Sequence, residues 1–225
     1  MTFSIAGHCS RTGQFGVAIT TSSICVGARC PHVRAGVGAV ATQNVTDPNL
    51  GPELLDHMET GKSATEAVEA VTKGREFIAY RQLLAVDASG RIGHFTGANI
   101  LGTNAVSEGV NAIAAGNLLS TSEVPGAMTR AFADNANEHL AERLLRSLEA
   151  GVAAGGEEGD VHSAALLVAG TTRFPLVSLR CDWDDEDPIA KLRQLWQRYE
   201  PEMQAYLDRA INPSVAPSYG VPGDL

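Results

Sequence analysis

The chain has 225 residues, 44% of them hydrophobic and 5% aromatic, and it carries a formal net charge of −9. A chain of this length buries about 70% of the surface that its unfolded form exposes, so a full core is possible without disulfides or metals. The acidic balance, with no stripe of Lys and Arg, argues against nucleic acid or an anionic membrane surface as a partner.

Short strands dominate the first forty residues. The patterns over 3–8 and 15–21, joined by a short polar turn, predict a β-hairpin. Residues 22–34 contain Gly and Pro, and we expect them to be irregular. Small residues alternate with valine over 35–43 and predict a third strand, whose glycines indicate close approach of another backbone or a ligand.

The middle of the chain combines helical and strand-like segments. We expect helices over 51–60 and 63–73, and the second begins with the Ser-x-x-Glu spacing of a capping box. Strand patterns follow over 80–86, 91–96 and 109–115. The short Asp-Ala-Ser-Gly segment between the first two of these strands predicts a second hairpin.

The last third adds two helices, a flexible acidic turn, two strands, an amphipathic helix and an irregular Pro-rich tail. These elements are expected at 123–135, 138–153, 155–160, 163–169, 176–180, 188–210 and from about 212. Hairpins without regular β-α-β alternation favour an α+β fold of antiparallel sheets covered by helices. No repeat or interior linker divides the chain, so we expect one domain over 1–225.

The sequence lacks the patterns of a membrane span, a secretory signal and a metal site, and these absences bear on the expected location and cofactor use. No run approaches the roughly 20 apolar residues of a membrane span, and the first residues lack the pattern of a secretory signal. We therefore expect a cytoplasmic protein. The 4 cysteines fall in no metal-binding spacing, so we expect free thiols, no metal and no cofactor.

Residue 2 carries the most specific chemical signal. Thr2 follows Met1 and begins the first predicted strand, and an initiator methionine is usually removed when the next residue is this small. A terminal threonine combines a hydroxyl with a free amine of pKa about 7.7–8.0, which can act as a general base near neutral pH. The alternative is that Thr2 is only a β-branched residue at a strand start.

Several segments share the pattern of one family: 1–5, 34–43, 81–83, 95–97, 115–119 and 163–168. Together they resemble an uncharacterised bacterial family, the domain of unknown function 1028 (DUF1028). The run Ala-Gly-Val-Gly-Ala-Val-Ala-Thr-Gln is the most specific part, and the similarity extends nearly to Asp184. That family resembles the N-terminal-nucleophile (Ntn) hydrolases. The resemblance implies a four-layer α-β-β-α sandwich of two antiparallel sheets, and cleavage of amide bonds by the first residue of the mature chain.

The resemblance also implies roles for individual residues. Thr2 Oγ1 would attack an amide carbonyl while its own amine takes the proton. Related enzymes have a basic residue on a neighbouring strand and a helper serine, which would be Arg34 and Ser163 here. The Gly116 N–H and the Asn117 amide are candidates to stabilise the oxyanion. The alternatives are a surface charge or a carboxylate clamp for Arg34, a strand-edge hydroxyl for Ser163 and a simple Gly-Asn turn at 116–117.

Polar residues at two strand ends are weaker candidates for substrate binding. Gln43 and Asn44 follow the third strand, and Ser22 follows the second, where loops often carry function. The alternative for Asn44 is a structural role, because Asn is as common in turns as it is in binding loops. Cys25 and His32 could form a nucleophile pair, although a buried free thiol is the commoner situation.

The leading hypothesis is therefore a hydrolase of a small-molecule amide C–N bond that uses Thr2, with the small molecule as partner. A non-catalytic scaffold that binds a small ligand or serves in assembly is the alternative. A hydrolase that uses Cys25 or Ser22 is a third possibility. We also expect a homo-oligomer, because the final helix could pack either on the sandwich or on another subunit.

Overall fold

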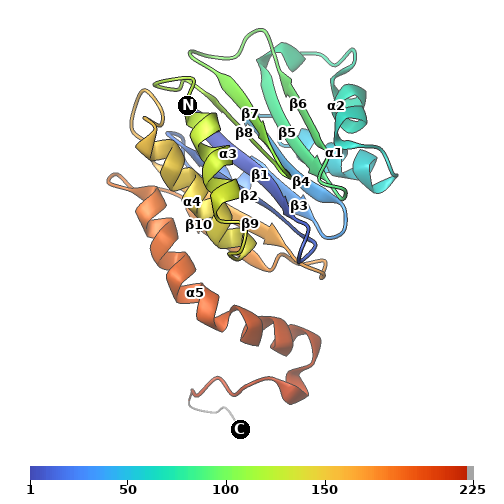
Figure 1. Ribbon diagram of the computed structural model, residues 1–225, viewed down its shortest axis with the longest axis vertical. Helices are drawn as coiled ribbons and strands as arrows, with labels where there is room; N and C mark the ends of the chain where they lie inside the picture. The colour runs from blue at the N-terminus through green and yellow to red at the C-terminus, as the bar shows by residue number, and fades with distance from the viewer. Residues whose placement is uncertain (222–225) are drawn as a thin grey trace.

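Two antiparallel sheets form the centre of the molecule (Figure 1). The structure is a computed structural model that describes residues 1–221. The larger sheet has the strand order β10 (Val177–Cys181), β9 (Ser163–Ala169), β2 (Gln14–Thr21), β1 (Thr2–Cys9), β8 (Ala112–Asn117) and β7 (Ala105–Gly109). The smaller sheet has the order β3 (Pro31–Arg34), β4 (Gly38–Asn44), β5 (Arg81–Asp87) and β6 (Ile92–Thr96).

Strand β1 lies in the middle of the larger sheet and is buried along its whole length. Side chains alternate between the two faces of a strand. Phe3 and Ile5 accordingly join the core beneath the helices, whereas Ala6 joins the layer between the sheets. Thr2 and Ser4 share the face of Ala6, so the hydroxyl of Thr2 points toward the smaller sheet.

Helices cover both outer faces. They are α1 (Leu50–Glu59), α2 (Ala64–Thr72), α3 (Val124–Asp134), α4 (Leu140–Ala153) and α5 (Pro188–Ile211). The first two pack on the smaller sheet, and α3 and α4 pack on the larger one. The expected capping box of α2 is confirmed, because the Glu66 N–H donates to Ser63 Oγ at 3.2 Å and the Ser63 N–H donates to Glu66 Oε2 at 2.8 Å.

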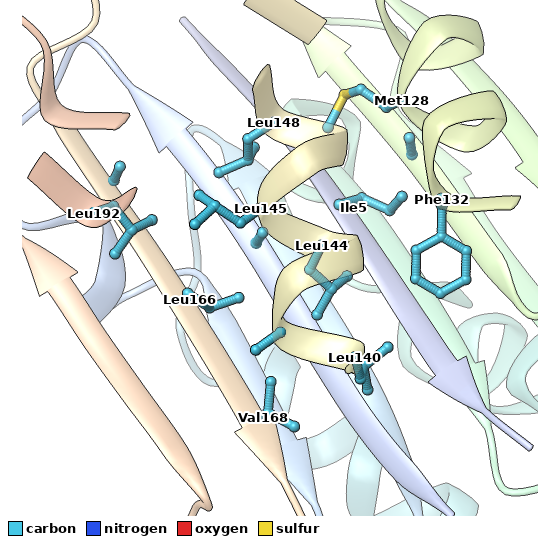
Figure 2. Packing of buried hydrophobic residues seen from close by; sticks show 14 of the residues in the cluster. Ile5, Met128, Phe132, Leu140, Leu144, Leu145, Leu148, Leu166, Val168 and Leu192 are labelled. Atoms are coloured by element: carbon cyan, nitrogen blue, oxygen red, sulfur yellow. The ribbon is translucent and has the colours of Figure 1, made fainter. Parts of the chain in front are cut away.

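The largest core lies between the larger sheet and its helices (Figure 2). Leu144, Leu145 and Leu148 of α4 point down onto the strands, where Ile5 and Leu166 meet them. This apolar stripe at positions i, i+1 and i+4 is the one that α4 must bury to be stable.

A second apolar layer joins the two sheets, and four of its nine buried members are alanine. Its buried members are Ala6, Phe15, Val17, Ala39, Ala41, Leu84, Val86, Ile113 and Ala115. The alanines leave room for the larger side chains of Phe15, Leu84 and Ile113 between the sheets. The order helix, sheet, sheet, helix is the four-layer α-β-β-α sandwich that the resemblance implied, so the expected α+β fold class is confirmed.

Two edge strands were missed in the sequence. Strand β3 lies in the segment expected to be irregular, because proline is tolerated at the start of an edge strand. The third strand begins at Gly38 and not at residue 35, since Gly36 has a φ of +71° in the turn that joins β3 to β4. Strand β7 is half-buried and therefore lacks a clear alternation.

Short 3-10 turns η1 (Val26–Ala28), η2 (Ile78–Tyr80) and η3 (Pro213–Val215) complete the described elements. The Pro-rich tail therefore contains one helical turn, and its last residues, 222–225, lie outside the described part. Across residues 1–221, every helix is too short or too polar to cross a bilayer.

Candidate active site

Buried polar side chains replace the apolar ones at one end of the layer between the sheets. We call this group the polar cluster; it consists of Thr2, Ser4, Thr21, Gln43, Gln82 and Asn117. Each member continues the inward face of its strand, and each is at most 6% exposed. Buried polar groups are costly unless they are hydrogen-bonded, so their concentration at one end of the layer marks a candidate site.

Strand pairing determines the neighbours of Thr2. Thr21 on β2 and Asn117 on β8 lie directly opposite it, one on each side. The Thr2 and Thr21 hydroxyl oxygens are 3.0 Å apart. The Met1 carbonyl accepts a hydrogen bond from Thr2 Oγ1 at 2.5 Å and another from Thr21 Oγ1. While Met1 is present, the Thr2 nitrogen is a peptide amide and cannot act as a base.

The glutamines link the two sheets. Ser4 Oγ donates to Gln43 Oε1 at 2.6 Å, and Gln43 Nε2 donates to Gln82 Oε1 at 2.8 Å. Asn117 Nδ2 donates to the same Gln82 oxygen at 3.3 Å. Asn117 Oδ1 is buried and accepts no hydrogen bond from the described residues. This oxygen is free to accept a hydrogen bond from a ligand or from an amine of the mature terminus.

Glu157 is a residue that the sequence analysis missed. It forms an isolated β-bridge with Leu119, is 8% exposed, and neither carboxyl oxygen has a hydrogen-bond partner among the described residues. Burial raises the pKa of Glu157 to about 8, while the chain's terminal amine and the nearby Ser22 N–H, which does not meet hydrogen-bond geometry, act in the opposite direction. The acidic, Gly-rich segment around Glu157 is typical of an exposed turn, and only its pairing with Leu119 buries the carboxyl.

The structure does not bring Arg34 to the polar cluster. Arg34 forms ion pairs with Asp56 at 2.7 Å and Glu59 at 2.6 Å on the outer side of the smaller sheet. It lies opposite Gly38 in the strand pairing, and Gln43 is five residues further along β4, or about 16 Å by the rise of a strand. Its side chain acts as a carboxylate clamp between β3 and α1.

Ser163 and Ser22 lie near the cluster without touching Thr2. Ser163 is opposite Thr21, donates to the Ser23 carbonyl at 2.6 Å and accepts from the Val26 N–H at 3.2 Å. It therefore holds the loop that follows β2. Ser22 begins that loop and is half-buried.

Gly116 and Asn44 have backbone roles in the described structure. Gly116 lies opposite Phe3, and its carbonyl accepts a hydrogen bond from Gln82 Nε2 at 3.3 Å. Asn44 has a φ of +71°, and its side chain donates to the Tyr80 carbonyl at 2.9 Å, which closes the end of β4. Of the predicted site residues, the structure brings together Thr2, Gln43 and Asn117.

The proposed Cys25 and His32 pair is not formed. His32 Nε2 lies 3.3 Å from the Arg29 carbonyl oxygen, and Cys25 begins the turn η1 with a φ of 58°. No hydrogen bond joins the two side chains within residues 1–221. In the same part of the chain, no group of three or more His, Cys, Asp and Glu side chains is arranged to hold a metal.

The chain matches one protein family in sequence and resembles solved structures in fold. A model of the family of unknown function DUF1028 matches residues 2–192. The crystal structure of protein SPO2555 from Silicibacter pomeroyi, assigned to DUF1028, is 36% identical with a TM-score of 0.81 over 88% of each chain. Anbu (ancestral beta-subunit) from Yersinia bercovieri is 9% identical with a TM-score of 0.41, over 91% of this chain and 97% of that one. No curated protein matches the sequence.

Proposed function

This chain belongs to the DUF1028 family, and we propose that it hydrolyses an amide C–N bond of a small molecule with Thr2 as the nucleophile. One observation carries the proposal. Thr2 begins the central strand β1, and its hydroxyl points into the buried polar cluster between the sheets, with Thr21 and Asn117 on either side. A strand-starting threonine with a purely structural role would not need this polar surrounding.

The chemistry requires removal of Met1. The released Thr2 amine then accepts the proton of its own hydroxyl, directly or through water, while Oγ1 forms a bond to the substrate carbonyl carbon. The C–N bond breaks as the leaving nitrogen takes the proton from the amine. Water then hydrolyses the threonine ester and regenerates the free hydroxyl and amine.

Thr21 and Asn117 are the best placed to assist this step. Removal of Met1 frees the Thr21 hydroxyl, which now donates to the Met1 carbonyl, to bind a substrate carbonyl at the same place. Preorganised donors of this kind stabilise the oxyanion by several kcal/mol in related chemistry. Asn117 Oδ1 is available to orient the terminal amine. Arg34 has no part in the proposed mechanism.

The non-catalytic alternative rests on a different observation. Thr2 is only 6% exposed, and its hydroxyl donates to the Met1 carbonyl. If Met1 is retained, the site stays covered and the terminal amine belongs to the wrong residue. The protein would then be a ligand-binding or assembly scaffold on the same sandwich.

Intact-mass measurement and a substrate screen distinguish the two functions. We expect a mature chain that begins at Thr2 and hydrolyses a member of a panel of small amides, lactams and ureido compounds. Thr2→Ala should fold normally and lose turnover by at least about a thousandfold, because the nucleophile is absent. The matched control Thr171→Ala, in the exposed loop between β9 and β10, should retain full activity.

Complete retention of Met1 would count against the terminal mechanism. So would unchanged turnover by Thr2→Ala on a substrate that the wild-type protein cleaves. Thr2→Ser offers a further check, since it keeps both a hydroxyl and a terminal amine and should preserve measurable activity.

A further inference from the structure

An acidic surface cavity lies beside the start of β1. It measures about 380 Å³ and is lined by the segment 155–161, by the beginning of α5 and by Phe3 and Val152. Its acidic side chains are Glu157, Glu158, Asp160, Glu186 and Asp187. No Lys, Arg or His lines it among the described residues, and the positive group that acts on its Glu157 is the chain's terminal amine.

Glu157 is the distinctive member of this cavity. Glu157 lines the cavity and is only 8% exposed. Both of its carboxyl oxygens lack a hydrogen-bond partner among the described residues. No ion pair within 4.0 Å is found for it in the described part of the chain, with the terminal amine included. A buried carboxyl is left without a partner in few native structures, because an unpaired charge in such a place is costly.

The other charged groups around the cavity do not supply the missing cation. Arg193 lines a neighbouring hollow, but it is held by Glu142 at 2.5 Å and by Glu149 at 2.8 Å. Asp187 is itself an anion, and its Oδ1 accepts hydrogen bonds from two amides at the start of α5. Glu158, Asp160 and Glu186 are exposed at the mouth of the cavity.

We propose that this cavity binds an organic cation, a primary ammonium or guanidinium group, with Glu157 as its buried counter-ion. An organic cation fits better than a metal ion, because the carboxylates here are not grouped as a set of three or more ligands. The apolar walls formed by Val152, Ile189 and Phe3 suit the alkyl stem of such a ligand.

The proposed cation site adds a class of substrate to the proposed function, and this inference rests on that function. Glu157 is close enough to the chain's terminal amine to feel its charge, so the cavity and the proposed nucleophile belong to one end of the sandwich. Phe3 lines the cavity on the helix side of β1, and the Thr2 hydroxyl points to the other face, so a substrate bound there would have to extend around the start of β1 to reach Thr2. The proposed hydrolase would then act on amides that carry a positive charge.

The binding step can be measured without any turnover. Titration calorimetry with butylguanidinium, which stays charged at every pH used, should show saturable binding to the purified protein, and 1-butanol should show none. Glu157→Gln should weaken binding of the cation at least fivefold. Glu200→Gln, an exposed change on α5, is the matched control and should bind as the wild type does.

Proton release adds a second readout. Because the pKa of Glu157 is raised to about 8, cation binding at pH 7 should release a proton, and the affinity should rise up to about pH 8. The heat measured at pH 7 should therefore depend on the ionisation enthalpy of the buffer. Glu157→Gln should abolish this dependence.

Equal binding of 1-butanol and butylguanidinium, or unchanged cation binding by Glu157→Gln, would overturn the proposal. If Glu157→Gln does not fold, the double variant Glu158→Gln/Glu186→Gln changes only the mouth and should weaken binding two- to threefold at low salt. Unchanged affinity of this double variant for butylguanidinium would likewise count against the proposed cation site. Thr2→Ala should bind the cation normally, so loss of cation binding and failure of the nucleophile remain distinguishable.

Discussion

At the scale of single residues, the polar cluster is the unusual feature of this protein. Gln43 and Gln82 occupy inward positions whose neighbours along the same strands are Ala41 and Leu84. Burying an amide is favourable only when its donors and acceptors are satisfied. Gln43 donates to Gln82 at 2.8 Å between neighbouring strands of the smaller sheet, and Ser4 and Asn117 of the larger sheet hydrogen-bond to the two glutamines across the layer.

Gln82→Leu tests this dependence. The change removes the oxygen that accepts from both Gln43 and Asn117, and leaves two buried amide groups poorly satisfied. We expect the free energy of unfolding to fall by about 2–3 kcal/mol, measured by urea denaturation. Gln197→Leu, an exposed change on α5, should stay within about 0.5 kcal/mol of the wild type. Equal effects of the two substitutions would show that the network contributes nothing.

Glu157 makes a prediction about pH. Its pKa is raised to about 8 in the folded state from an ordinary value of 4.5, so the folded protein holds the proton more tightly than the unfolded chain. The stability that this group contributes is complete below pH 4.5 and is lost as the pH rises through 8. We expect the free energy of unfolding to fall by on the order of 3 kcal/mol between pH 5 and pH 9 from this group.

The comparison with Glu157→Gln isolates this effect from other titrating groups. The variant should lose most of the decline in stability toward pH 9, whereas the exposed neighbour Glu158→Gln should keep it. Parallel stability curves for the wild type and Glu157→Gln would refute the raised pKa.

At the scale of elements, helices and central strands followed the sequence pattern closely. Amphipathic spacing located α4, and the Ser63 capping box located the start of α2. The edge strands β6 and β10 were predicted, whereas β3 and β7, which have only one fully buried residue between them, were missed. Local pattern is therefore a good guide where burial is complete and an uneven one at the edges of a sheet.

Helix α5 is anchored to the sandwich by fully buried residues of its first half, and Met203 and Leu207 of its second half also pack against that core. Leu192 and Trp196 join the core beneath α4, and the Trp196 indole donates to Glu142 Oε2 at 2.9 Å. Trp196→Ala should therefore lower the free energy of unfolding by about 3–5 kcal/mol, measured by denaturant titration. Trp183→Ala, at a tryptophan that is 48% exposed, should cost less than about 1 kcal/mol. A small loss in both variants would mean that α5 is held elsewhere.

At the scale of the whole molecule, the second half of α5 extends away from the sandwich (Figure 1). It presents exposed apolar and aromatic side chains, among them Tyr206 at 43% and Ile211 at 62% exposure. This part of the helix follows the region that the family model matches, residues 2–192. The homo-oligomer expected from the sequence stays a prediction, and this extension is the surface that would serve it.

Light scattering during size exclusion checks the oligomeric state. We expect a mass that is a multiple of the 23.6 kDa chain, since an exposed apolar surface of this kind is rarely left in water. The double change Tyr206→Glu/Ile211→Lys should shift the protein toward the single-chain mass. Arg198→Glu, a polar change on the same helix, should leave the oligomer intact. A monomer at all concentrations tested would contradict the prediction.

The sequence by itself determined much of this protein, because the responsible interactions are local. Alternation of side chains identified the strands, apolar stripes identified the helices, and family-specific segments indicated the sandwich. Thr2 stood out because its position in the chain is itself a chemical property. Gln43 and Asn117 were also recognisable, as polar residues at the ends of buried strands.

Only the tertiary structure decided which residues surround Thr2. Arg34 was predicted near it, yet clamps two carboxylates of α1, whereas Ser163 does lie close by, opposite Thr21, and holds the loop after β2. Gln82 and Glu157 carried no local signal, because their burial comes from sheet stacking and from a bridge to Leu119. These outcomes depend on strand register and layer packing between residues far apart in the chain, and no local pattern encodes them.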